Sequence, residues 1–185
     1  ILIHGGSEAR RRYLDWGLFH VEPDFLPQWR RYARALKQRN ALLRSRRAES
    51  QLDAWEHELA QTGERLSGYR NEYVARLQPH LDGIATALFP SAGAVALGLQ
   101  PGWKWQELAL ADALLLTRER DQAQGHTTIG PHRADLRLEF GSFAGRDMLS
   151  RGQAKLAALS LLLAQAAQLA EHEDAWPVLQ LDDLV

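Results

Sequence analysis

The strongest constraint on this chain is a turn of sequence Leu-Ser-Arg-Gly-Gln, residues 149–153, followed at a distance by two adjacent acids. The residues after the turn predict a helix to about residue 171. The apolar segment 178–181 then predicts a strand that ends in Asp182 and Asp183. Such a turn offers a hydroxyl, backbone N–H groups and a helix N-terminus to an anion. Two carboxylates at a strand end can hold Mg²⁺ and position a water. The order of parts therefore predicts an α/β fold that binds phosphate and magnesium.

Each half of this pattern has a simpler interpretation when it is taken alone. Serine is a favoured N-cap in any helix, and Ser-x-Gly-Gln recurs by chance. Adjacent acids after a strand also occur in plain turns and at helix caps. Only the succession of turn, helix, strand and acids favours the phosphate and magnesium site.

Residues 29–73 have the pattern of a helical hairpin. The first stripe runs through Trp29, Tyr32, Ala33, Leu36, Asn40 and Leu43. After a polar turn near 45–50, the second runs through Leu52, Trp55, Leu59, Thr62, Leu66, Tyr69 and Tyr73. Steps of three and four residues are typical of a coiled-coil seam. We expect two antiparallel helices, the second kinked or ended at Pro79 and continuing to about Phe89.

Beyond the hairpin, period-two alternation predicts strands at 95–99 and 134–140, and a helix is expected at 105–122. Trp103 and Trp105 are better explained as core or edge anchors than as a stacking platform. His126, His132 and Asp135 lack the i, i+4 spacing of helical metal ligands, so no metal site is predicted there. The chain has no cysteine and no apolar run that spans a bilayer comfortably, so we expect a cytoplasmic protein without a membrane partner.

Charge is unevenly distributed, although the formal net charge is only -1. Residues 1–47 carry eleven basic side chains against four acids. A cluster of this kind can be a nucleic-acid footprint, and it can equally be a solvated helix face. The candidate phosphate contacts on the hairpin are Arg30, Arg31, Arg34, Lys37, Arg44 and Arg46.

Several blocks of the chain resemble the RecF family of bacterial DNA-repair proteins. The family consists of ATP-binding-cassette (ABC) ATPases of the structural-maintenance-of-chromosomes type. The similar blocks are residues 11–20 with Pro23, residues 38–43, residues 130–136, residues 149–153 and the Asp-Asp strand end. Arg151 within the turn, and Asp183 where relatives often have Glu, favour RecF over related ATPases.

The resemblance implies an α/β fold that is part of an ABC-type P-loop ATPase head with a helical-hairpin, short coiled-coil arm. Residues 1–22 would be a head segment that leads into the arm. Residues 23–90 would form the arm, in the second lobe. Residues 91–185 would be the head segment with the signature turn and the Walker B strand.

The resemblance also implies roles for individual residues in an ATP-dependent, head-to-tail homodimer. Ser150, Arg151, Gly152 and Gln153 would contact the γ-phosphate of ATP bound to the opposite subunit. In the strand, Asp182 would be the Mg²⁺ ligand and Asp183 would occupy the catalytic-base position.

The chain departs from the family pattern in one important respect. It contains no glycine-rich phosphate loop with Lys-Ser/Thr, since Gly5, Gly6 and Ser7 lack both the lysine and the spacing. We therefore expect an internal piece of a longer protein that does not hydrolyse ATP alone. The full protein is expected to be a slow, DNA-stimulated ATPase.

The function implied is ATP-dependent DNA binding in recombinational repair of gapped DNA. DNA with single-strand–double-strand junctions, RecR and RecO would be the partners. Two alternatives remain: another ABC-type ATPase, such as a transporter subunit, and a non-enzymatic helical assembly module. The heptad hairpin and the arginine bias argue against the transporter.

Overall fold

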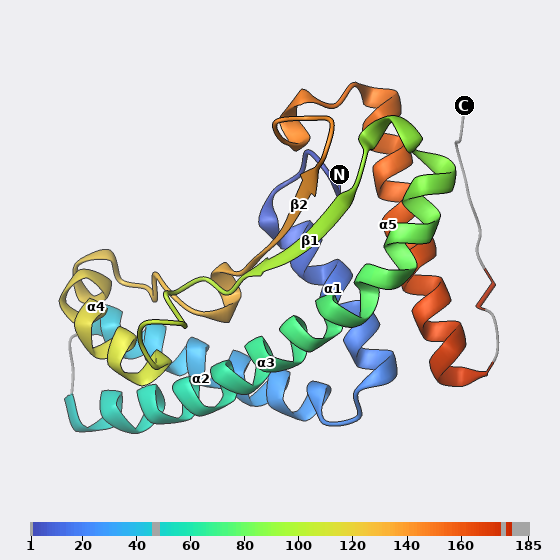
Figure 1. The fold of residues 1–185 in the computed structure, drawn as a ribbon. Helices are drawn as coiled ribbons and strands as arrows, with labels where there is room; N and C mark the ends of the chain where they lie inside the picture. The colour runs from blue at the N-terminus through green and yellow to red at the C-terminus, as the bar shows by residue number, and fades with distance from the viewer. Residues whose placement is uncertain (1, 46–48, 175–176, 179–185) are drawn as a thin grey trace.

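The computed structural model describes residues 2–45, 49–174 and 177–178 (Figure 1). In chain order the elements are α1 (Ser7–Val21), α2 (Phe25–Ser45), α3 (Glu49–Leu88), the 3-10 turn η1 (Pro90–Ala92), β1 (Val95–Gln100), α4 (Leu110–Gln124), η2 (Pro131–Arg133), β2 (Asp135–Phe140), η3 (Arg146–Met148) and α5 (Arg151–Glu173). Within these ranges, no helix is long and apolar enough to cross a membrane.

Helices α2 and α3 lie side by side and form the predicted hairpin (Figure 1). At 40 residues, α3 is about 60 Å long. It runs along α2 and continues until it packs against α5. Pro79 lies inside α3, which continues to Leu88; this confirms the predicted continuation to about Phe89, and α3 bends along its C-terminal half in Figure 1. One continuous helix therefore joins the hairpin to the rest of the molecule.

The buried side of the hairpin differs from the predicted stripe on α2. Arg39 and Ala35 are fully buried, whereas the predicted Asn40 and Leu36 are only partly buried. The reason is a buried ion network: the Arg39 guanidinium donates to Glu56 of α3 at 2.9–3.0 Å and to Asp121 of α4 at 2.7 Å. A periodicity of apolar residues does not detect a seam that contains paired charges.

Strands β1 and β2 form an antiparallel ribbon, which confirms both predicted strands. Leu97 lies opposite Leu138 in the register. The Gln78 side-chain amide donates to the Val95 carbonyl at 2.8 Å and accepts from the Leu97 N–H at 2.7 Å. It thereby fastens the β1 edge to α3. Helix α4 begins at Leu110, later than the predicted 105, after turns over residues 101–108.

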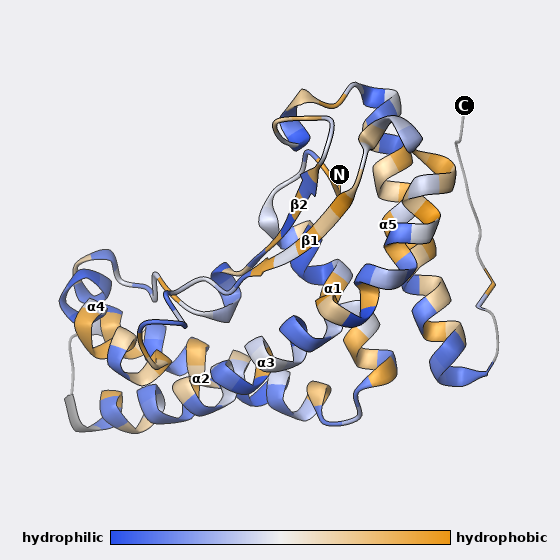
Figure 2. Cartoon of the chain, viewed as in Figure 1, coloured by the Kyte–Doolittle hydropathy of each residue, from blue (hydrophilic) through white to orange (hydrophobic). Residues whose placement is uncertain are grey.

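Helices α1, α3 and α5 meet at a buried junction. The Tyr13 hydroxyl donates to the Leu161 carbonyl at 2.6 Å, and the Gln165 amide donates to the Tyr13 carbonyl at 2.8 Å and to the Tyr73 hydroxyl at 3.1 Å. A Cβ on Gly17 would lie 1.9 Å from that hydroxyl, so only glycine fits. Figure 2 shows hydrophobic residues concentrated in β1 and α5, whereas α2 and the hairpin part of α3 carry long hydrophilic stretches. The main core lies where the three helices meet.

Candidate functional site

The turn 149–153 begins helix α5, as predicted. The Ser150 hydroxyl accepts from the Gln153 backbone N–H at 3.3 Å, and the Gln153 side-chain oxygen accepts from the Ser150 N–H at 2.9 Å. This reciprocal capping box satisfies two of the donors that every helix N-terminus leaves open. The polar side chains of the turn are thus held in place before any ligand arrives.

The outer side of the turn is open to solvent. Ser150, Arg151 and Gly152 are exposed, and a Cβ built on Gly152 meets nothing within 4 Å. The N–H groups of Arg151 and Gly152 belong to the first helical turn and have no intrahelical acceptor. Together with the helix dipole and the Arg151 charge, they can bind an anion. The turn is therefore both a helix cap and a potential phosphate site, and these two interpretations do not exclude each other.

Buried contacts fix the position of the turn. Leu149 is buried, and the Arg146 guanidinium lies 3.7 Å from Asp135 at the start of β2. Asp135 also receives two hydrogen bonds from the buried Arg10 of α1, at 2.6 and 2.9 Å. The turn is consequently anchored to both β2 and α1.

The two acids assigned to magnesium and catalysis, Asp182 and Asp183, lie outside the described residues, as does most of the predicted strand 178–181. Their roles stay predictions.

The basic residues of α2 divide into two groups. Arg30, Arg34, Lys37 and Arg44 are exposed and fall within about 80° of one another around the helix axis. We call these four residues the α2 stripe. Within it, the Arg34 guanidinium lies over the ring of Trp55, 5.7 Å from the centroid. The α2 stripe extends for about 21 Å along the helix.

Arg31 differs from the α2 stripe because its charge is already paired. Its guanidinium donates to both carboxylate oxygens of Glu58 on α3, at 2.8 and 2.9 Å. This pair raises the pKa of Arg31 and lowers the pKa of Glu58. Arg46, the sixth predicted contact, lies outside the described residues.

His132 has a structural role that the sequence did not indicate. Its Nδ1 lies 2.7 Å from the Tyr32 hydroxyl of α2 and its Nε2 lies 3.0 Å from the Thr127 carbonyl. Since the carbonyl can only accept, Nε2 carries the proton and Nδ1 accepts from Tyr32. Burial lowers the pKa of His132 to about 4, so the ring is neutral near pH 7. The described residues contain no cluster of three or more potential metal ligands.

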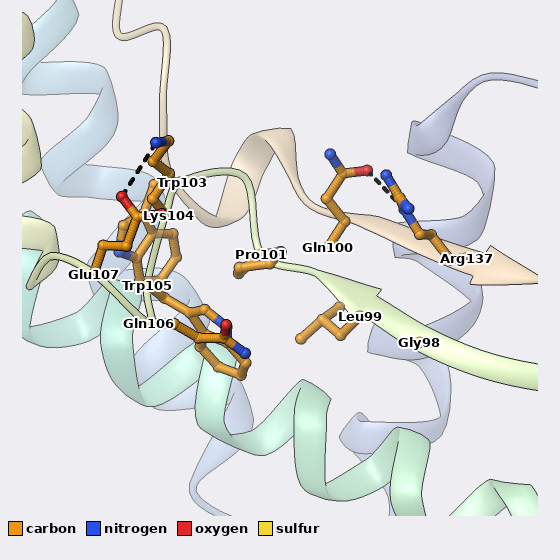
Figure 3. Close-up of a pocket in the computed structure, with 10 residues that line it drawn as sticks. All are labelled: Gly98, Leu99, Gln100, Pro101, Trp103, Lys104, Trp105, Gln106, Glu107 and Arg137. Carbon is orange, nitrogen blue, oxygen red and sulfur yellow. Dashed lines mark hydrogen bonds and ion pairs between the residues drawn. The ribbon is translucent and has the colours of Figure 1, made fainter.

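A shallow hollow of about 360 Å³ lies where β1 ends and residues 101–107 turn away from it (Figure 3). Trp103 and Trp105 meet edge to face with centroids 6.3 Å apart, and the Trp103 indole donates to the Leu108 carbonyl at 3.2 Å. The cations in Figure 3 are already engaged, Lys104 with Glu107 and Arg137 with Gln100. The two tryptophans are therefore anchors of a turn, as the sequence suggests.

No family model matches the chain. Individual proteins do. The chain is 60% identical over 184 residues to the DNA replication and repair protein RecF of Xanthomonas euvesicatoria, a match that covers 100% of this chain and 50% of the relative. The chain is a RecF homologue. The RecF of Stenotrophomonas maltophilia is 58% identical over 183 residues, and that of Stutzerimonas stutzeri is 40% identical over 184 residues. The chain spans about half the length of the RecF proteins it matches.

Solved RecF structures have the same fold. The recombination mediator protein RecF-ATP in the RecFOR pathway matches 99% of this chain and 52% of its own, with a TM-score of 0.88 and 26% identity. A second RecF structure, with ATPrS, gives a TM-score of 0.89 at the same coverage. The fold is α/β, part of an ABC ATPase head with a helical arm, and ATP binding is a property of these RecF structures.

Proposed function

We propose that the protein to which this chain belongs is an ATP-gated DNA-binding protein of recombinational repair, acting on gapped DNA in the RecFOR pathway. The relatives are named for DNA replication and repair, and the matched structure is of RecF with ATP in that pathway. RecO and RecR would be its protein partners, and its place of action would be the cytoplasm, where the bacterial chromosome lies. The domain division at residues 22 and 90 is part of this proposal.

The observation that carries the proposal is the exposed, pre-capped turn at the start of α5. Its hydroxyl, its two open N–H groups and its arginine face solvent, while α5 itself is held by α1 and α3. A phosphate-binding surface that is rigid and outward-facing is suited to a nucleotide held by another subunit.

In this proposal, Ser150, Arg151, Gly152 and Gln153 contact the γ-phosphate of ATP bound to the opposite subunit of a head-to-tail homodimer. Asp182 holds the Mg²⁺ that neutralises the phosphates, and Asp183 polarises the attacking water. Slow hydrolysis then opens the dimer and releases DNA.

The DNA surface is proposed to include the α2 stripe. Among the carboxylates of residues 2–45 and 51–174, none lies within 4.0 Å of its four cations, and a phosphate contact needs such an unpaired charge. Arg31 is removed from the set of contacts because Glu58 already neutralises it. A single-strand–double-strand junction is the DNA that gap repair presents.

Nucleotide-dependent dimerisation of the full-length protein tests the trans-phosphate site. Ser150→Arg places a bulky side chain where the phosphate would lie, so we expect ATP to bind but dimerisation to be lost. Ser45→Arg, the same substitution at the far end of α2, is the matched control and should dimerise normally. Sedimentation velocity with and without ATP measures both. A Ser150→Arg protein that dimerises like the control would show that the turn does not contact nucleotide.

A further inference from the structure

A cavity of about 370 Å³ lies between α1, α2 and α3. Its walls combine two kinds of side chain. Helix α1 contributes guanidinium groups, including Arg11 and Arg12, and α2 contributes apolar and aromatic groups, including Trp29 and Leu36. We call this cavity the α1–α2 cleft.

Most of the charges that line the α1–α2 cleft are paired. Asp15 accepts two hydrogen bonds from Arg70, at 2.8 and 2.9 Å. Glu8 accepts from Arg12 at 2.6 Å. Neither carboxylate has an unpaired charge to repel an anion, and neither arginine has an unpaired charge to attract one.

Arg11 is the exception. It has no carboxylate within 4.0 Å among the described residues; its Nη1 donates to two neutral acceptors, the Ser7 hydroxyl at 2.7 Å and the Ala134 carbonyl at 2.8 Å. Burial is the main cause that lowers the pKa of Arg11 and Arg70 adds to it, while Asp135, Glu8 and Asp15 act in the opposite direction. A partly buried cation is stabilised when an anion binds beside it. The unpaired charge of Arg11 thus favours the binding of a single negative group in the α1–α2 cleft.

The opposite wall offers an aromatic face. Trp29 lines the cleft and is 39% exposed. Phe19 meets its ring edge to face at 6.1 Å and supports it from the side. A supported, accessible indole next to a guanidinium is the combination with which proteins bind single-stranded nucleic acid, since the base stacks and the phosphate pairs.

The α1–α2 cleft is also next to the α2 stripe. Trp29 directly precedes Arg30, and the cleft-lining Ala33 directly precedes Arg34. On the helix, the cleft face and the stripe face are about 110° apart. A single DNA strand that lies along the α2 stripe can therefore enter the cleft while it stays in contact with α2.

We propose that the α1–α2 cleft binds one unpaired nucleotide of DNA, with the phosphodiester on Arg11 and the base against Trp29. The site rests on the proposed function, because it extends the DNA path of the α2 stripe. It gives the protein a reason to prefer a junction over a blunt duplex: bases in a duplex are stacked on one another and cannot enter.

The test is DNA binding by the full-length protein with a non-hydrolysable ATP analogue, measured by fluorescence anisotropy. The probes are a blunt duplex, a duplex with a single-stranded tail and a single strand alone. Arg11→Gln and Trp29→Leu should each weaken the tailed duplex and the single strand by about fivefold or more. For the single strand, Arg11→Gln should also lower the salt slope of log K by about 0.7. The blunt duplex should be bound as by wild type.

Two controls separate binding from folding. Arg137→Gln removes an exposed arginine of the hollow in Figure 3 and should change nothing. Arg11→Lys keeps the charge and should restore the salt slope. Thermal melting of every variant shows whether it is folded.

The outcomes for the cleft and for the α2 stripe are distinguishable. If neutralising the stripe weakens DNA binding while Arg11→Gln leaves all three probes unchanged, the cleft assignment is overturned and the proposed function stands. If Arg11→Gln weakens the blunt duplex as much as the tailed one, the cleft contacts phosphate but holds no unpaired base, and the proposal is again overturned. If neither set of variants affects any probe, the proposed DNA surface itself is wrong.

Discussion

Neutralising part of the α2 stripe has a calculable effect on DNA affinity. In the variant Arg30→Gln/Arg34→Gln/Lys37→Gln, three exposed cations are replaced by neutral side chains of similar length. Each cation that neutralises a duplex phosphate releases a counterion, and each contributes about 0.9 to the slope of log K against log salt. We therefore expect the slope to fall by about 2.7, which corresponds to a roughly 500-fold loss of affinity at 0.1 M salt.

The adjacent pair provides a matched control. Arg31→Gln/Glu58→Gln removes an arginine from the same helix, but the charges of Arg31 and Glu58 already cancel in a hydrogen-bonded pair. Its slope should therefore equal that of wild type. The assay is anisotropy of a labelled duplex at several salt concentrations with full-length protein and ATP. A triple variant whose slope stays within about 0.5 of wild type would refute the assignment of these residues to phosphates.

Two further predictions concern stability. Gly17→Ala should destabilise the protein by about 1–3 kcal/mol or more, because its Cβ would meet the Tyr73 hydroxyl at 1.9 Å. Gly68→Ala, in an open part of α3, should instead stabilise it by about 0.5–1 kcal/mol. Urea unfolding measures both free energies, and equal effects of the two substitutions would contradict the packing argument. For His132, the pKa of about 4 lies below the ordinary value of 6.5, so the unfolded chain binds the proton more tightly. Its contribution should be complete above pH 6.5 and should fall, by at most about 3 kcal/mol, as pH drops toward 4. The wild-type protein should thus lose more stability than His132→Gln over this interval, and parallel pH profiles would contradict the buried neutral ring.

The features of this protein that depend on neighbouring residues in the sequence were predicted correctly. Alternation over 134–140 predicted β2 because successive side chains of a strand face opposite sides. Ser150 and Gln153 predicted the start of α5 because a capping box involves only four consecutive residues. The resemblance to RecF was likewise carried by short, local blocks.

The boundaries and seams were less predictable, because they depend on distant partners. Arg39 has the pattern of a surface residue in sequence, yet it is fully buried, since Glu56 and Asp121 come from two other helices to pair with it. Pro79 left open whether the helix would be kinked or interrupted there; the structure has one continuous helix to Leu88, because its packing against α5 and β1 outweighs one missing hydrogen bond.

The sequence by itself determined which chemistry this protein carries: a capped anion-binding turn, a basic helix and a RecF-type order of blocks. Only the tertiary structure decided which of its charges are available. Arg31 is neutralised across the hairpin by Glu58, and Arg70 is paired with Asp15. Arg11 lines a cavity and has no carboxylate within 4.0 Å of it among the described residues. The physical reason is that a charge is cancelled by an opposite charge within a few ångströms of it, and here that opposite charge comes from another helix. Asp15 and Arg70, for example, are 55 residues apart in the sequence.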